Sequence, residues 1–80
     1  MTQITVYHKP NCVQCQTTIR RLEDRGLAYT AVDLTLDPVA MQTVWVAGHR
    51  GAPVIAVDGQ ITWSGFRPDL IDALAEGGAP

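Results

Sequence analysis

The sequence predicts an α/β fold of four strands and three helices in the order βαβαββα. Three observations support this fold class. In the first half of the chain, alternating apolar stretches typical of strands are separated by segments of helical period. The pair Asp58-Gly59, between two further apolar stretches, is typical of a two-residue hairpin. A last segment of helical period begins at Pro68. Together these features predict a mixed sheet with helices on its faces.

The first three elements are expected to form a strand–helix–strand unit. Residues 4–7 alternate as a strand does, residues 12–25 have helical period, and residues 29–33 are expected to form the second strand. The residues that recur at helical spacing are Cys15, Ile19 and Leu22. Because a right-handed crossover through a helix joins parallel strands, the two strands are expected to lie parallel.

Capping preferences set the expected limits of the first helix. Asn11 is a good N-cap, and Gln14 stands three residues further on, the spacing of a capping box. Gly26 suits the left-handed position after the last turn, and Leu27 can fold back onto the helix. Cys12 is therefore expected in the first helical turn, beside the preceding loop.

A second helix is expected to begin at Asp37 and Pro38, an N-cap followed by proline in the first turn. Gly48 should end it, and His49 should lie in an exposed loop. The residues expected on its inward face are Met41, Val44 and Trp45.

A hairpin and a last helix complete the prediction. Residues 51–57 and 60–63 are the expected strands of the hairpin. Pro68 opens the last helix, and Gly77-Gly78 ends it. The residues of this helix expected to face inward are Leu70, Ile71 and Leu74.

Composition limits what the chain can be. Its 80 residues allow a single domain over residues 1–80, and 46% apolar residues allow a globular core. The net charge of −2 and the few basic residues argue against nucleic-acid binding. No apolar run reaches the length of a membrane span, and the N-terminus lacks a signal-peptide pattern. We therefore expect a cytoplasmic, monomeric protein that does not bind membranes.

The only two cysteines, Cys12 and Cys15, stand three residues apart where the first strand gives way to the first helix. This spacing places both sulfurs on one face of a helical turn. A thiol attacks as its thiolate, which the unpaired N–H groups and partial positive charge of a helix start stabilise. We expect Cys12 to attack a target disulfide and the more shielded Cys15 to resolve the mixed disulfide.

Other roles for the pair are open from the residues alone. A structural disulfide closing so short a loop would stabilise the fold by only about 2 kcal/mol. Half of a zinc site, completed by His8 and His49, would lack the second knuckle or paired histidines of a structural zinc site. The cysteines could also be unreactive core residues. His8 and Lys9 either add positive potential near Cys12 or are solvated loop residues. The strand-then-helix context favours redox chemistry.

Several motifs give the chain a resemblance to a known family. It resembles the thioredoxin fold in its short glutaredoxin-like form, and within that superfamily it is similar to the NrdH-redoxins. The resemblance covers nearly the whole chain. The motifs that carry it are Cys12-Val13-Gln14-Cys15, Ala52-Pro53-Val54, Asp58-Gly59 and Trp63-Ser64-Gly65-Phe66-Arg67-Pro68-Asp69.

The resemblance implies a thiol–disulfide oxidoreductase that acts as an electron carrier. NrdH-redoxins pass electrons to the large subunit of class Ib ribonucleotide reductase. They are reduced by the flavoprotein thioredoxin reductase at the expense of NADPH, and they need no bound cofactor or metal of their own. Ordinary glutaredoxins carry Pro-Tyr between the cysteines and a Gly-Gly followed by acidic residues after the fourth strand. Val13-Gln14 and residues 64–67 depart from this pattern, which argues against glutathione use.

The resemblance also implies which residues meet a partner. Pro53 is expected to be cis, which would turn the backbone of Ala52 toward the cysteines for strand-like pairing with a target segment. From the residues alone, Pro53 could equally well just begin the strand. Further partner-binding residues are expected in the turn after the hairpin. Trp63 is expected partly in the core and Phe66 is expected to dock a partner, although Trp63 could be wholly core and Phe66 could plug the end of the last helix. Arg67 is expected to hold the turn by binding backbone carbonyls, which is a structural role. The residues of this expected surface are Ala52, Pro53, Trp63, Ser64, Gly65, Phe66 and Arg67.

Two alternative functions stay open. A glutathione-dependent glutaredoxin would turn over with glutathione and glutathione reductase. A non-enzymatic module would hold zinc or an iron–sulfur cluster. Because one chain supplies only two thiolates, a cluster would need a dimer or outside ligands.

Overall fold

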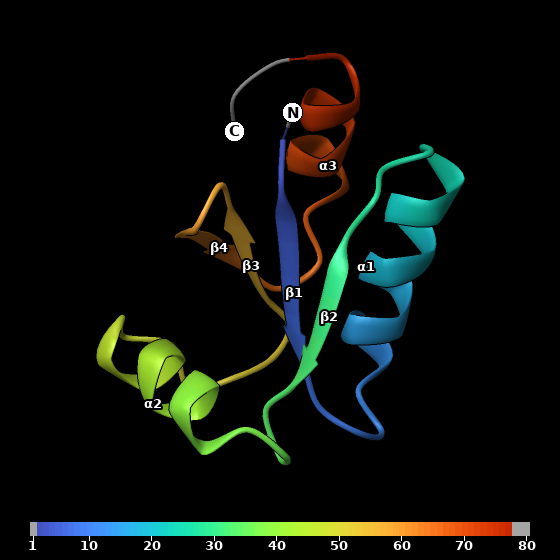
Figure 1. Cartoon of the computed structure of the whole chain (residues 1–80). Coiled ribbons are helices and arrows are strands. Elements are labelled where there is room, and N and C mark those ends of the chain that lie inside the picture. Colours follow the sequence, from blue (N-terminus) through green and yellow to red (C-terminus); the bar gives the residue numbers. More distant parts are fainter. Residues whose placement is uncertain (1, 78–80) are drawn as a thin grey trace.

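The computed structural model describes residues 2–77 and contains the predicted elements in the predicted order (Figure 1). In chain order they are β1 (Ile4–His8), α1 (Val13–Asp24), β2 (Thr30–Asp33), α2 (Pro38–Val46), β3 (Val54–Val57), β4 (Gln60–Ser64) and α3 (Pro68–Ala75). The strand predicted over residues 51–57 began too early, because the first ladder pair of β3 is at Val54. Of the two glycines expected to end α3, Gly77 follows its last turn and Gly78 lies outside the described residues.

The four strands form one mixed sheet in the order β2-β1-β3-β4. β1 runs parallel to β2, as predicted, and antiparallel to β3, which pairs antiparallel with β4. The predicted hairpin is present, since Asp58 and Gly59 both have positive φ, the requirement of a two-residue type I′ turn. The chain therefore folds as a thioredoxin-like α/β domain, with its helices on both faces of the sheet (Figure 1).

The larger core lies between the sheet and the pair α1 and α3. Its buried members are Ile4, Val6, Leu22, Ile55, Trp63, Ile71 and Leu74. A β-bulge in β4 brings Trp63 into this core: Trp63 pairs with Ile55, whereas Ile61 pairs with the next residue, Ala56. Thr62 is the extra residue, so Ile61 and Trp63 face opposite sides of the sheet although they are two apart.

The predicted ending of α1 is confirmed. The N–H of Leu27 donates to the carbonyl of Leu22 at 2.9 Å, and that of Gly26 donates to Glu23 at 3.0 Å. With Gly26 at φ +70°, these bonds make a Schellman motif. Because Leu27 then packs against the core that holds Leu22, the turn fixes the direction in which the chain enters β2.

The smaller core lies under α2 and is formed by Leu34, Ala40, Val44 and Val54. The predicted inward face of α2 was correct for Val44, which is buried. It was wrong for Met41 and Trp45, which are 41% and 54% exposed. Because α2 carries no charged residue and its apolar residues are spread around the helix, its sequence did not identify the face that packs. Within residues 2–77, no helix is both long and apolar enough to cross a membrane.

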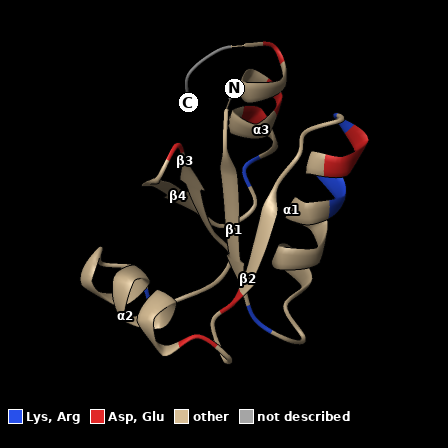
Figure 2. Cartoon of the chain, viewed as in Figure 1, with Lys and Arg blue, Asp and Glu red and all other residues tan. Residues whose placement is uncertain are grey.

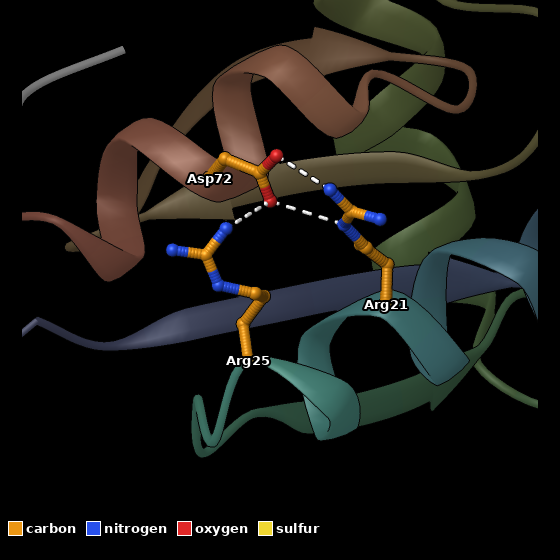
Figure 3. A network of polar contacts seen from close by, with 3 residues as sticks. All are labelled: Arg21, Arg25 and Asp72. Carbon is orange, nitrogen blue, oxygen red and sulfur yellow. Dashed lines mark hydrogen bonds and ion pairs between the residues drawn. The ribbon is translucent and has the colours of Figure 1, made fainter.

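An ion-pair network joins α1 to α3 (Figure 3). Arg21 donates to both carboxylate oxygens of Asp72, with Nε 3.0 Å from Oδ1, and Nη1 of Arg25 lies 2.8 Å from Oδ1. The side-chain hydrogen bonds from Arg21 hold the pKa of Asp72 below its ordinary value of 3.8. Figure 2 shows how the charged residues gather on the second half of α1 and on α3, while the ribbon of α2 carries none.

We expect Asp72→Asn to lower the melting temperature at pH 7, because it leaves two arginines without their shared carboxylate. The folded state depresses the pKa of Asp72, so its contribution is complete above pH 3.8 and is lost as the pH falls through the depressed value. The difference between Asp72→Asn and wild type should therefore shrink on acidification. Thermal melts between pH 7 and pH 2 measure this.

Glu76→Gln is the matched control, since it removes the same charge from the same end of the chain. Within the described residues the carboxylate of Glu76 forms no ion pair. Its melting temperature should stay close to that of wild type across the pH range. An Asp72→Asn deficit that is constant down to pH 2 would contradict the role of the network.

Candidate functional site

The two cysteines lie where the chain leaves β1 and enters α1. Asn11 adopts a left-handed conformation with φ +58°, which asparagine tolerates better than most residues, and turns the chain into the helix. The predicted N-cap was wrong by one residue: the N-cap is Cys12, whose Sγ accepts from the backbone N–H of Cys15 at 3.1 Å. Cys12 therefore stands just before the first turn of α1, and not within it.

Cys12 and Cys15 form a disulfide, with Cα atoms 5.2 Å apart. Cys12 is 8% exposed to solvent and Cys15 is 2% exposed. Both residues are therefore buried. Cys12 lies in the loop between β1 and α1, and Cys15 faces inward from α1. Cys15 is the more shielded of the two, as expected, and the division of catalytic roles between them stays a prediction.

Two backbone groups face Sγ of Cys12 with opposite electrostatic effects. The N–H of Cys15 at 3.1 Å favours a thiolate, and so does the partial positive charge at the start of α1. The carbonyl oxygen of Ala52 lies 3.7 Å away and favours the protonated thiol, to which it offers an acceptor. Reduction of the disulfide thus leaves Cys12 between a group that stabilises its anion and a group that can hold its proton.

The loop before β3 forms the second wall of the site. The Ala52–Pro53 peptide bond is cis, as the resemblance implied. The carbonyl of Pro53 accepts from the N–H of Gly65 at 2.9 Å, which ties this loop to the turn after β4. Within residues 2–77 the backbone of Ala52 makes no hydrogen bond to another backbone group, so its N–H and C=O are free to pair with an added strand.

A hydrogen bond that the sequence did not predict joins the cysteine motif to the turn after β4. Oε1 of Gln14 accepts from the N–H of Phe66 at 3.3 Å, across 52 positions of sequence. Gly65, at φ +82°, lies between the loop before β3, to which its N–H donates, and the side chain of Gln14. A Cβ at this position would stand 3.5 Å from Oε1 of Gln14. Gln14 was expected to complete a capping box, but its side chain instead links the cysteine motif to the turn after β4.

The remaining residues of the expected partner surface differ in exposure. Trp63 is 5% exposed and belongs to the core, while Phe66 is half-buried against that core. Ser64 and Arg67 are exposed. Arg67 was expected to bind backbone carbonyls, but it forms a two-pronged ion pair with Asp69 (3.2 and 2.9 Å), since that carboxylate stands two residues further on.

The histidines do not join the cysteines in a metal site. His8 is half-buried at the end of β1, and His49 is half-buried in the loop after α2, where we had expected an exposed residue. Among residues 2–77 there is no group of three His, Cys, Asp or Glu side chains arranged to hold a metal ion.

Comparison with known proteins fits this arrangement of cysteines, cis-proline loop and turn. The sequence model of the glutaredoxin family matches residues 4–62. The glutaredoxin-like protein NrdH of Salmonella typhimurium is 45% identical over 71 residues, which are 89% of this chain and 86% of that protein. The chain belongs to the NrdH-redoxin branch of the glutaredoxin family. The NrdH protein of Lactococcus lactis subsp. cremoris is 36% identical over 90% of this NrdH-redoxin chain and 99% of its own length.

A solved structure agrees with the sequence comparison. NrdH-redoxin from Escherichia coli superimposes on this chain with a TM-score of 0.84, at 38% identity, covering 90% of this chain and 93% of that one. That protein is described as glutaredoxin-like with a thioredoxin-like activity profile. As an NrdH-redoxin, this chain is a small dithiol redoxin, and the disulfide between Cys12 and Cys15 is its redox-active group.

Proposed function

We propose that this chain, as a cytoplasmic electron carrier, reduces a disulfide in the large subunit of class Ib ribonucleotide reductase and is itself reduced by thioredoxin reductase with NADPH. The observation that carries the proposal is the placement of Sγ of Cys12 at the start of α1, bonded to the N–H of Cys15 and beside the free backbone of Ala52. This placement suits a nucleophile that must meet another protein. The NrdH relatives and the thioredoxin-like profile of the Escherichia coli protein support the choice of partners.

In the proposed reaction the Cys12 thiolate attacks one sulfur of the target disulfide. A bond forms between Sγ of Cys12 and that sulfur, and the other target sulfur leaves as a thiolate that takes up a proton. Cys15 then attacks Sγ of Cys12, which closes the intramolecular disulfide and releases the second target thiol. Two electrons pass to the target, and the redoxin reaches the oxidised state described above.

The target segment is proposed to pair with Ala52 in the manner of an added strand. The N–H and C=O of Ala52 have no backbone partner, and its carbonyl lies 3.7 Å from Sγ of Cys12. A segment held there by main-chain bonds would present its cystine to Cys12 without needing a particular side chain. Ser64 and Phe66, in and after the end of β4, are the residues proposed to contact the target segment from the other side of the cysteines. Trp63 supports them from the core.

Reduction by thioredoxin reductase rather than by glutathione is part of the proposal. The chain lacks the Pro-Tyr and the Gly-Gly-acidic segments of ordinary glutaredoxins, and its turn after β4 is drawn onto the cysteine motif by the bond from Phe66 to Gln14. These two departures from the glutaredoxin pattern are the features that support reduction by thioredoxin reductase.

The choice of reductant is tested by giving the oxidised protein each reducing system separately. With thioredoxin reductase, NADPH and insulin we expect NADPH consumption that scales with the concentration of the redoxin. With glutathione, glutathione reductase and the same substrate we expect a rate close to the background without redoxin. Absorbance at the NADPH band measures both.

Turnover that is faster with glutathione would replace the proposal with a glutaredoxin function. The partner is tested with the class Ib reductase itself, since deoxyribonucleotide formation should depend on the redoxin when thioredoxin reductase and NADPH are the only electron source. A reductase that turns over equally well without the redoxin would contradict that partner.

A further inference from the structure

A small pocket adjoins the redox site on its α2 side. It has a volume of about 190 Å³ and lies between α2, the loop after β1 and the loop before β3. Leu34, Met41 and Val44 form its apolar floor, and Ala52, whose carbonyl faces Cys12, forms its edge. Because typical small-molecule sites measure roughly 300–1,000 Å³, this pocket is the size of one side chain. Its occupant would enter beside the target segment.

The rim of this pocket is cationic. Of the six Lys and Arg residues of the chain, three form ion pairs with Asp69 or Asp72. Within residues 2–77, Lys9, Arg20 and Arg50 form none, and two of these, Lys9 and Arg50, line the pocket together with His49. No acidic residue lines it.

The two acidic residues nearest to the pocket along the chain already accept hydrogen bonds from residues two or three positions further on. Asp33 accepts from the N–H and hydroxyl of Thr35 at 2.8 and 2.6 Å. Asp37 caps α2 by accepting from the N–H of Ala40 at 3.0 Å. Neither forms an ion pair with a cation of the pocket rim, so the rim cations remain available to an incoming carboxylate.

Arg50 is held in place although it lies on the surface. Its guanidinium carbon stands 3.7 Å from the ring centroid of Trp45, and Nη1 donates to the carbonyl of Trp45 at 2.7 Å. Trp45 is 54% exposed, so this stack stands in solvent at the pocket mouth. Among the described residues Nε and Nη2 of Arg50 have no acceptor. A guanidinium fixed in this way loses little further freedom when it binds a carboxylate.

We propose that this pocket recognises an acidic side chain in the partner segment that carries the target disulfide, and that Arg50 sets the preference. The aliphatic stem of a glutamate would lie on Met41 and Val44, and its carboxylate would meet Arg50 and Lys9 at the rim. A protein segment fits better than a free anion, because the pocket shares Ala52 with the strand-pairing edge and has an apolar floor. This inference rests on the proposed function, since it names a feature of the same target.

The test compares matched peptides as substrates of the pre-reduced protein. Each peptide is closed by one disulfide, and a single glutamate replaces glutamine at one of the three positions on either side of the attacked cysteine. Second-order rate constants are measured by acid quench and thiol alkylation at low salt. We expect at least one glutamate register to react about three- to fivefold faster than its glutamine partner, the effect of one exposed ion pair.

Variants assign the preference to Arg50. Arg50→Gln should lower the ratio of the glutamate rate to the glutamine rate, because only Lys9 then faces the carboxylate. Arg20→Gln, which removes an equal charge from an exposed position on α1, should retain the preference. Raising the salt concentration should weaken the preference in wild type.

Each result has a distinct meaning. Equal glutamate and glutamine rates in every register, or a preference that Arg50→Gln leaves undiminished, would overturn this inference and leave the disulfide-reductase function standing. A preference lost equally in Arg20→Gln would also overturn it, since general charge would then explain the rates. A protein that reduces no peptide at all would overturn the proposed function, and the acidic-target inference with it.

Discussion

Cys12→Ser should reduce disulfide reduction to the uncatalysed background. The variant has no sulfur at the position that accepts from the N–H of Cys15, and a serine hydroxyl is not ionised at neutral pH. The hydroxyl can still accept that N–H as an N-cap, so the start of α1 should persist. Insulin reduction with thioredoxin reductase and NADPH measures the loss, and far-ultraviolet circular dichroism checks the helix.

Cys15→Ser should behave differently, because it removes the resolving thiol and keeps the attacking one. The variant is expected to accumulate a mixed disulfide between Cys12 and the target, visible as a mass increase that dithiothreitol reverses. The double variant Cys12→Ser/Cys15→Ser should form no adduct. If Cys12→Ser retained activity, or if the adduct formed on Cys15, the assignment of roles to the two cysteines would be wrong.

Leu22→Ala should destabilise the fold by about 2–5 kcal/mol, the usual effect of emptying a packed leucine site. Leu22 is fully buried between α1 and the sheet, and its carbonyl also accepts the bond that ends the helix. Small native domains have only about 5–15 kcal/mol of stability, so this single change removes a large share. Urea unfolding of the oxidised protein gives the value, with an unchanged m-value as evidence for two-state behaviour.

Leu36→Ala is the matched control for this prediction. Leu36 is 80% exposed in the turn before α2, and its removal should change stability by less than about 0.5 kcal/mol. Equal losses for the two variants would mean that the core between α1, α3 and the sheet is not the main source of stability.

The sequence was sufficient for the elements and their order because their signals are local. The endings of α1 and of the hairpin follow from Gly26 and from Asp58-Gly59, which need positive φ where they stand. The side of α2 that packs was not predictable, since apolar residues occur all around this uncharged helix and leave no periodic signal. Met41 and Trp45 were therefore assigned to the core, although the sheet covers only the neighbouring strip of the helix.

The site was predictable in its chemistry and less so in its geometry. The spacing of Cys12 and Cys15 indicated a dithiol, but the choice of N-cap depended on the left-handed turn at Asn11, which no neighbouring residue signals. The bond from Phe66 to Gln14 spans 52 positions and the pairing of Arg21 with Asp72 spans 51, so neither leaves a local pattern. Such contacts appear only when the fold brings distant segments together.

The bulge at Thr62 leaves β4 with one position to spare. Adjacent side chains of a regular strand point to opposite faces, so a homologue that lacks the extra position would still pair the same two residues with Ala56 and Ile55 and would still turn its indole into the larger core. The loss of a second position would have no bulge to absorb it, and it would move the indole to the opposite face of the sheet. Alignments of this branch should therefore accept a gap of one residue between the hairpin and the tryptophan without reassigning the core.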